Sequence, residues 1–160
     1  MKQLKFDAVV VGGGAAGMSA AAELRSRGYS ALVIEREEEL GGILLQCIHN
    51  GFGLIEFNEE LSGPEVAQRI EERAVALGIE TLCGTTVLEI RREGGFNVVY
   101  GVSSKHGGLR VEARAVVLAM GCRERNRGNI RIPGSRPSGV YPGGLAQRLV
   151  NRDGSLPGKA

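Results

Sequence analysis

The chain has 160 residues and a formal net charge of +2, with acidic and basic residues interspersed along it. This length supports one domain with its own hydrophobic core, and the mixed charges give no basic stripe of the kind that binds DNA. Aromatic residues make up only 4% of the chain, so few rings can stack on bases, and binding to single-stranded nucleic acid is disfavoured as well.

Membrane insertion and secretion are also disfavoured. No apolar run approaches the ~18 residues needed to span a bilayer, and the N-terminal residues lead into a strand pattern without a signal-peptide core. The three cysteines form no CxxC motif, which is typical of a reducing compartment. We therefore expect a cytoplasmic protein without a membrane span, and the absence of HxxxH and CxxC motifs predicts no metal site.

The first 35 residues indicate a strand, a glycine turn, a helix and a second strand. Residues 6–11 form a β-branched apolar run, which is typical of a buried parallel strand. After the glycine turn, residues 18–27 are good helix formers that end before a glycine, and residues 31–34 are again strongly apolar. This order predicts a βαβ unit.

A long glycine-containing connection, residues 36–61, follows, and its apolar content indicates that it is ordered. Ser62 and Glu65 then form a capping-box pattern at the start of a helix that ends before Gly78. The remaining strand patterns are a third strand at 79–83, a β-meander of three short strands at 86–91, 96–102 and 109–113, and a buried strand at 115–119. Four of the five prolines lie in the last 40 residues, where only 144–150 looks helical.

The glycine turn has the spacing of a dinucleotide-binding fingerprint. Gly12 permits the tight turn, Gly14 lets a pyrophosphate approach the backbone, and Gly17 lets the helix pack closely on the sheet. The helix N-terminus offers free amides to the phosphates. Glu35, at the end of the second strand, can accept a hydrogen bond from a ribose 2′-hydroxyl and would repel a 2′-phosphate. A ligand-free turn is disfavoured because all parts of the fingerprint occur together.

Several segments resemble the flavoproteins with two dinucleotide-binding domains, the glutathione reductase–like or pyridine nucleotide-disulfide oxidoreductase superfamily. These segments are Val9 to Glu37, Gly41-Gly42, and the meander followed by Ala115 to Gly134, where Met120 occupies a position that is usually Thr. The motifs GGILLQCIHNGFGL and AMGCRERNRGNIRIPG are also similar to the FAD subunits of glycerol-3-phosphate, amine and opine dehydrogenases or oxidases.

The resemblance implies an α/β fold, namely a Rossmann-like FAD-binding domain with a parallel sheet and a β-meander crossover. Residues 1–122 would be the N-terminal part of the FAD-binding domain. Residues 123–160 would be a Gly/Pro-rich connector that leads, in a longer parent protein, to an NAD-binding domain that this chain lacks. We therefore expect FAD as the cofactor, and NAD(P)H as a second one in the parent.

The resemblance also assigns the cofactor contacts residue by residue. The predicted contacts are Gly12, Gly14, Ala15, Ala16 and Gly17 at the pyrophosphate, Glu35 and Arg36 at the adenosine ribose, Gly41, Gly42 and Ile43 at the ribityl and flavin end, Val87 at the adenine, and Ala119, Met120 and Gly121 against the cofactor.

Catalytic residues are not identified by sequence, and Cys47 and His49 are weak candidates. Disulfide reductases of the superfamily have CxxxxC after the Gly-Gly pair, whereas Phe52 stands where the partner of Cys47 would be. A buried thiol is therefore the favoured interpretation of Cys47. His49 can act as an acid or base near the flavin or can simply bind backbone carbonyls. The arginines at 123, 125, 127 and 131 can attract phosphate or remain a solvated surface.

We expect an FAD-dependent oxidoreductase that transfers electrons between NAD(P)H or a small organic donor and an acceptor. The main alternative is a non-catalytic flavin- or nucleotide-binding module, or a subunit of an amine or glycerol-3-phosphate dehydrogenase complex. A protein that binds NAD alone is disfavoured by the meander and by Gly41-Gly42. The expected partners are a small-molecule substrate and a partner subunit or a second copy of the chain.

Overall fold

The computed structural model describes residues 1–135 and 137–158, so Arg136 and the last two residues of the predicted connector lie outside the described residues. Its centre is a six-stranded sheet with the strand order β3-β2-β1-β6-β5-β4. Strands β3, β2, β1 and β6 are parallel, and β6, β5 and β4 are antiparallel. The predicted α/β fold, with a parallel sheet and a β-meander, is confirmed. Within the two described ranges no helix is long and apolar enough to cross a bilayer.

The strand boundaries agree with the sequence for β2 and β3 and differ for β1 and β6. Strand β1 begins four residues before the predicted start at residue 6, because its first half pairs with β6 from Leu109 onwards. The strands are β1 (Lys2–Val11), β2 (Ala31–Ile34), β3 (Glu80–Leu82), β4 (Thr85–Glu93), β5 (Phe96–Ser103) and β6 (Gly107–Leu118).

The prediction of two separate strands at 109–113 and 115–119 was wrong, because both belong to β6. This strand pairs with β5 on one side up to Ala113 and with β1 on the other side up to Leu118. Arg114, between the two apolar runs, is exposed. It lies beyond the edge of β5, where β6 continues along β1, so its side chain can reach water without interrupting the strand.

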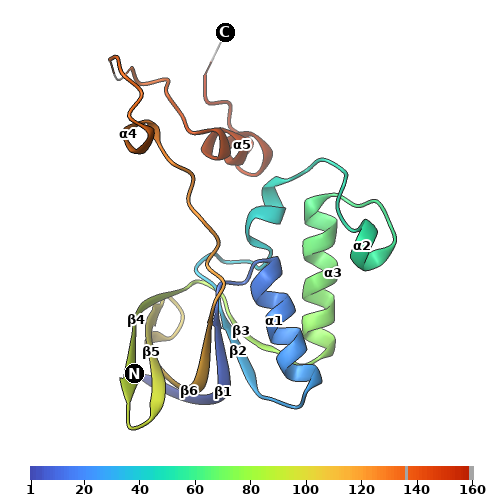
Figure 1. The fold of residues 1–160 in the computed structure, drawn as a ribbon, viewed down its shortest axis with the longest axis vertical. Coiled ribbons are helices and arrows are strands. Elements are labelled where there is room, and N and C mark those ends of the chain that lie inside the picture. The colour runs from blue at the N-terminus through green and yellow to red at the C-terminus, as the bar shows by residue number, and fades with distance from the viewer. Residues whose placement is uncertain (136, 159–160) are drawn as a thin grey trace.

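Two long helices lie side by side against one face of the sheet (Figure 1). Helix α1 begins at Ala15, inside the glycine turn and earlier than predicted. The start of α3 has the predicted cap, since Glu65 Oε2 accepts hydrogen bonds from Ser62 N and Oγ, both at 2.7 Å. The helical elements are α1 (Ala15–Ser26), η1 (Gly42–Gln46), α2 (Leu54–Phe57), α3 (Gly63–Ala76), α4 (Arg127–Ile130) and α5 (Gly143–Asn151). The short elements η1 and α2 lie in the connection that the sequence left without secondary structure.

Apolar packing on both faces holds β1 and β2 at the centre of the molecule. On the helical face, Val10 and Val33 pack with Met18 and Ala21 of α1, and α3 contributes Ala74. On the opposite face, alternate residues of β1 and β2 pack against the meander, in a cluster of Val9, Val11, Leu32, Ile34, Val99, Leu109, Val111 and Ala113. Burial on both faces explains why β1 and β2 have continuous apolar runs instead of alternating ones.

Helix α1 approaches strand β1 so closely that one methyl group added at the contact should destabilise the fold. A Cβ at Gly17 would collide with the carbonyl oxygen of Gly12. Gly17→Ala should therefore lower the free energy of unfolding by about 1–3 kcal/mol, although alanine is by ~1 kcal/mol the better helix former. Urea denaturation measures the change. Gly139→Ala is the control, because its Cβ would meet no atom within 4 Å; equal stability of both variants would contradict the prediction.

Candidate functional site

The carboxyl ends of β1, β2 and β6 meet at one edge of the sheet, where the glycine turn leads into α1 (Figure 1). Gly12 N donates to the carbonyl oxygen of Ile34 at 2.8 Å, and Ala119 N donates to that of Val11 at 2.8 Å. Residues that follow three different strands are thereby fixed around the turn. In open α/β sheets this edge is where ligands bind.

The three glycines of the fingerprint are required for different reasons. Gly12 has a φ of +107°, and a Cβ on it would collide with the carbonyl of Ala119. Gly17 faces the carbonyl of Gly12, as described above. Gly14 has an ordinary φ of −76°, and the nearest atom to a Cβ built on it would be Gly42 Cα at 3.9 Å. The protein's own packing therefore does not require glycine at 14, and the missing side chain leaves space in front of α1.

This space lies at the positive end of a helix whose first amides are not capped. The first hydrogen bond of α1 joins Met18 N to Gly14 O at 3.0 Å, and no side chain caps the helix. Among the described residues, no acceptor is paired with the amides of Ala16 or Gly17. Ala15 and Ala16 are exposed. Free amides and the helix dipole favour a phosphate at this position.

The Glu35 carboxylate lies beside the turn and is held in a fixed orientation. Its side chain is buried, with 8% exposure. One oxygen accepts from Gly13 N at 2.6 Å, and the other accepts from Glu37 N at 2.8 Å. Each oxygen has a further lone pair, so the carboxylate can still accept hydrogen bonds from sugar hydroxyls. Arg36 is exposed and forms an ion pair with Glu37 at 3.5 Å.

Gly41 and Gly42 fold back onto the glycine turn although they are 27 residues or more further along the chain than Gly14. Gly41 N donates to Gly13 O at 2.9 Å. A Cβ on Gly42 would lie 3.1 Å from Gly14 Cα, so the two backbones are in close contact. Both residues have positive φ, at +114° and +56°. Ile43, the next residue, is exposed at the start of η1.

The other predicted contacts also lie at this edge. Thr85 N donates to Glu35 O at 2.9 Å, and Val87, two residues further along β4, packs against the cluster that contains Val11 and Ile34. The carbonyl of Ala119 lies against Gly12. Met120 and Gly121 follow it and are exposed. The structure thus brings the residues expected to contact a cofactor to one edge of the sheet.

Among the described residues, no hydrogen bond joins Cys47 or His49 to the residues expected to contact a cofactor. The carbonyl of Cys47 accepts from Gly63 N at 2.9 Å, and the half-buried thiol lies at the start of α3. His49 is exposed; its Nδ1 is 2.9 Å from the carbonyl of Asn50, and its ring packs on Phe52. Cys83 lies in the helical-face cluster, where burial, followed by the Glu35 charge, raises the pKa of its thiol.

Sequence reasoning missed the contacts between α5 and the loop that follows Glu35. Arg148 forms an ion pair with Glu37 at 3.3 Å, and Arg152 forms one with Glu39 at 2.5 Å. The hydrogen bond from Arg148 holds the pKa of the Glu37 carboxyl below its usual value, and the charges of Arg152 and Arg36 act in the same direction. A separation of 111 residues between Arg148 and Glu37 leaves no local pattern from which this pair could be found.

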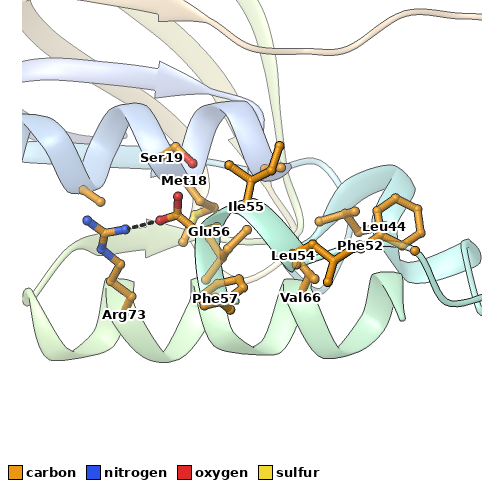
Figure 2. Close-up of a pocket in the computed structure, with 15 residues that line it drawn as sticks. Met18, Ser19, Leu44, Phe52, Leu54, Ile55, Glu56, Phe57, Val66 and Arg73 are labelled. Atoms are coloured by element: carbon orange, nitrogen blue, oxygen red, sulfur yellow. Dashed lines mark hydrogen bonds and ion pairs between the residues drawn. The ribbon is translucent and has the colours of Figure 1, made fainter. Parts of the chain in front are cut away.

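An apolar cavity of about 540 Å³ lies between α1, α2 and α3, with Ala15 in its wall (Figure 2). Figure 2 shows Glu56 and Arg73 meeting at its edge, where an ion pair joins them at 2.9 Å. Apolar side chains dominate the lining, including Met18, Leu44, Leu54, Phe57, Val66 and Ile70. Across the described part of the chain, no group of three or more His, Cys, Asp or Glu side chains is placed to hold a metal ion.

A parallel sheet, a glycine turn with space for a phosphate, an uncapped helix N-terminus and an adjacent carboxylate define a Rossmann-like dinucleotide-binding domain. Comparison with known proteins agrees, because residues 10–56 match the family model of the NAD(P)-binding Rossmann-like domain.

The chain is homologous to oxidoreductases, as the sequence predicted. It is 30% identical over 130 residues to thioredoxin reductase from Treponema pallidum, covering 81% of this chain and 38% of the relative. It is 28% identical over 156 residues to one of the subunits of opine oxidase from Rhizobium meliloti, covering 96% of this chain and 32% of the relative. The chain therefore spans about a third of the length of these curated relatives.

Solved structures share the fold. L-proline dehydrogenase from P. horikoshii superimposes with a TM-score of 0.75 at 23% identity, over 98% of this chain and 30% of that structure. Thioredoxin reductase from Streptococcus pyogenes superimposes with a TM-score of 0.64 at 24% identity, over 78% of this chain and 38% of that structure. These two likenesses show a shared fold, and the family model by itself supports a nucleotide cofactor.

Because the space in front of Gly14 is open, a substitution there should weaken ligand binding without destabilising the fold. Residue 14 has an ordinary φ, and a methyl group added there would collide with no atom. The free energy of unfolding of Gly14→Ala should therefore stay within about 0.5 kcal/mol of wild type. The methyl group would occupy the position of a diphosphate, and the affinity for ADP should fall at least about 10-fold. Calorimetric titration with ADP measures the affinity, with Gly139→Ala as control. Unchanged ADP affinity in Gly14→Ala would contradict the prediction.

The lowered pKa of Glu37 predicts an acid-sensitive contribution to stability. Because the folded-state pKa lies below the unfolded one, the ionised carboxylate stabilises the fold at neutral pH, and this contribution disappears as the pH falls through the folded-state pKa. Wild type should exceed Glu37→Gln in stability by up to about 1 kcal/mol at pH 7. The difference should shrink as the pH falls below the ordinary carboxyl range and should vanish only below the folded-state pKa.

Urea denaturation at several pH values measures this difference. In an Arg148→Gln background, where the main hydrogen-bond partner of Glu37 is missing, the change to Gln should have a clearly smaller effect at pH 7. A difference that persists at low pH, or one that is unaffected by Arg148→Gln, would refute the assignment to this ion pair.

Proposed function

We propose that the chain is the flavin-binding domain of an FAD-dependent oxidoreductase that transfers electrons between NAD(P)H or a small organic donor and an acceptor. The observation that carries the proposal is the open space at Gly14 between the free amides of α1 and the fixed carboxylate of Glu35. A diphosphate and the neighbouring ribose match these two features in charge and in hydrogen bonding.

The residues of the chain would bind and orient the cofactor. The amides of Ala16 and Gly17 would donate to the diphosphate, and Glu35 would accept from the adenosine ribose. Gly41 and Gly42, which lie against Gly14, would let the other half of the cofactor pass close to the backbone. When bound, FAD supplies the electron-transfer chemistry, and the protein determines its position and surroundings.

FAD is preferred over NAD as the ligand of this chain for two reasons. The β-meander and the Gly41-Gly42 contact resemble the flavin domain of the superfamily. The relatives named reductase, oxidase and dehydrogenase also support a redox role. We propose residues 1–122 as part of the FAD-binding domain and 123–160 as a connector to an NAD(P)H-binding domain in a longer protein. Because the opine oxidase relative is named as one subunit of its enzyme, the similarity to it supports a partner subunit for this chain.

A non-catalytic nucleotide-binding module is the second candidate, since no hydrogen bond joins Cys47 or His49 to the glycine turn within the described residues. Addition of FAD to the purified chain distinguishes the candidates. Retention of a flavin absorption band after desalting supports a flavin domain, whereas ADP binding without FAD retention supports the module. Binding of neither ligand would refute both.

The carboxylate of Glu35 predicts selectivity for the ribose. ADP with an additional 2′-phosphate should bind at least about 10-fold more weakly than ADP, because the phosphate and the carboxylate repel each other. Glu35→Gln should reduce this ratio, and Glu38→Gln, at an exposed carboxylate, should leave it unchanged. Calorimetric titration of each variant with both ligands measures the ratio. Equal ratios in wild type and Glu35→Gln would show that Glu35 does not contact the ribose.

A further inference from the structure

Helix α5 is attached to the core through a buried glutamine in η1. The side chain of Gln46 is 9% exposed, and its amide donates to Gly144 O at 3.2 Å and to Gln147 Oε1 at 2.9 Å. Asn151 Nδ2 donates in turn to the backbone carbonyl of Gln46 at 2.8 Å. All the hydrogen bonds of the Gln46 side chain thus go to α5. This glutamine follows Gly41 and Gly42 by only a few residues.

Two ion pairs attach α5 to the loop that begins at Glu35. Arg148 contacts Glu37, and Arg152 contacts Glu39, as described above. The amide of Glu37 also donates to the Glu35 carboxylate. A shift of this loop would therefore be transmitted directly to the carboxylate proposed to hold the ribose.

The N-terminus of α5 is attached to the other side of the site. Glu124 accepts from Gly144 N at 2.7 Å and from Leu145 N at 2.8 Å, so its carboxylate caps the first turn of the helix. Glu124 lies in the segment that leaves the sheet at Ala119 and passes Gly12. Helix α5 therefore joins two segments that bound the site, residues 35–46 and 119–124.

These contacts are almost entirely polar. No residue of α5 is buried: Leu145 and Val150 are 42% and 45% exposed, and Leu149 is half-buried. A nine-residue helix is not stable by itself in water, and each hydrogen bond or exposed ion pair adds only a small stabilisation. The free energy of docking is therefore small enough for a ligand to change the docked population.

We propose that α5 is a strap that positions both walls of the dinucleotide site, with Gln46 as the positioning residue, and that strap docking and dinucleotide binding reinforce each other. The inference rests on the proposed function for the identity of the ligand. Coupling between two such equilibria is reciprocal, so the ligand must stabilise docked α5 by the same factor by which docked α5 strengthens binding.

Two variants test the strap from opposite sides. Gln46→Ala removes the hydrogen bonds from the η1 side, and Asn151→Ala removes one from α5 without changing any residue of the site. Both should weaken ADP binding to the full 160-residue chain about 5-fold. The control is Gln68→Ala, at an exposed glutamine of α3 that bonds only Glu72, and it should bind ADP like wild type.

Hydrogen exchange of the α5 amides supplies the readout that a merely structural role would not change. ADP should slow exchange in α5 of wild type, and both strap variants should exchange faster there while α1 and α3 stay protected. Suppose that wild type binds ADP, that ADP does not change hydrogen exchange in α5, and that both variants bind ADP like wild type. The strap proposal is then refuted, while the proposed function is not. If wild type binds neither ADP nor FAD, both proposals fall. Unfolding free energies identify any variant that fails to fold.

Discussion

The direct contact between the backbone of α1 and the end of β1 is the constraint on which the rest of the site depends. Gly17 lies against the carbonyl of Gly12, which places the first turn of α1 at the edge of the sheet. The free amides then point toward the space at Gly14, where the Glu35 carboxylate and Gly42 also lie. Gly12 and Gly17 thus allow the helix to pack against the strand end, and Gly14 between them leaves space for a ligand.

Local patterns were sufficient for much of the fold. Continuous apolar runs predicted β1 and β2, and Ser62 with Glu65 predicted the start of α3, because each signal depends on neighbouring residues. The same reasoning divided residues 109–119 into two strands, whereas pairing with β1 and β5 decides the extent of β6. The short elements η1 and α2 were also missed, since fewer than two helical turns show no periodicity.

For the site, the sequence predicted which residues gather but not how they are held. The spacing of Gly12, Gly14 and Gly17 and the position of Glu35 follow from a βαβ unit, in which turn and strand end are neighbours. The hydrogen bond from Gly13 to Glu35 and the hydrogen bond between Gln46 and α5 depend on side-chain geometry. Partners separated by about a hundred residues leave no pattern in a single sequence, so Gln46 could not be identified before the structure was known.

The uninterrupted strand β6 restricts how this domain can change in length. Its residues pair with β1 along one side and end at the segment that presses on Gly12. Deleting or inserting one residue within β6 would turn every following side chain to the opposite face and displace Ala119 from the turn. Length variation should therefore be confined to the hairpin connection at 94–95, where the backbone is exposed and lies at the end of the meander away from the glycine turn.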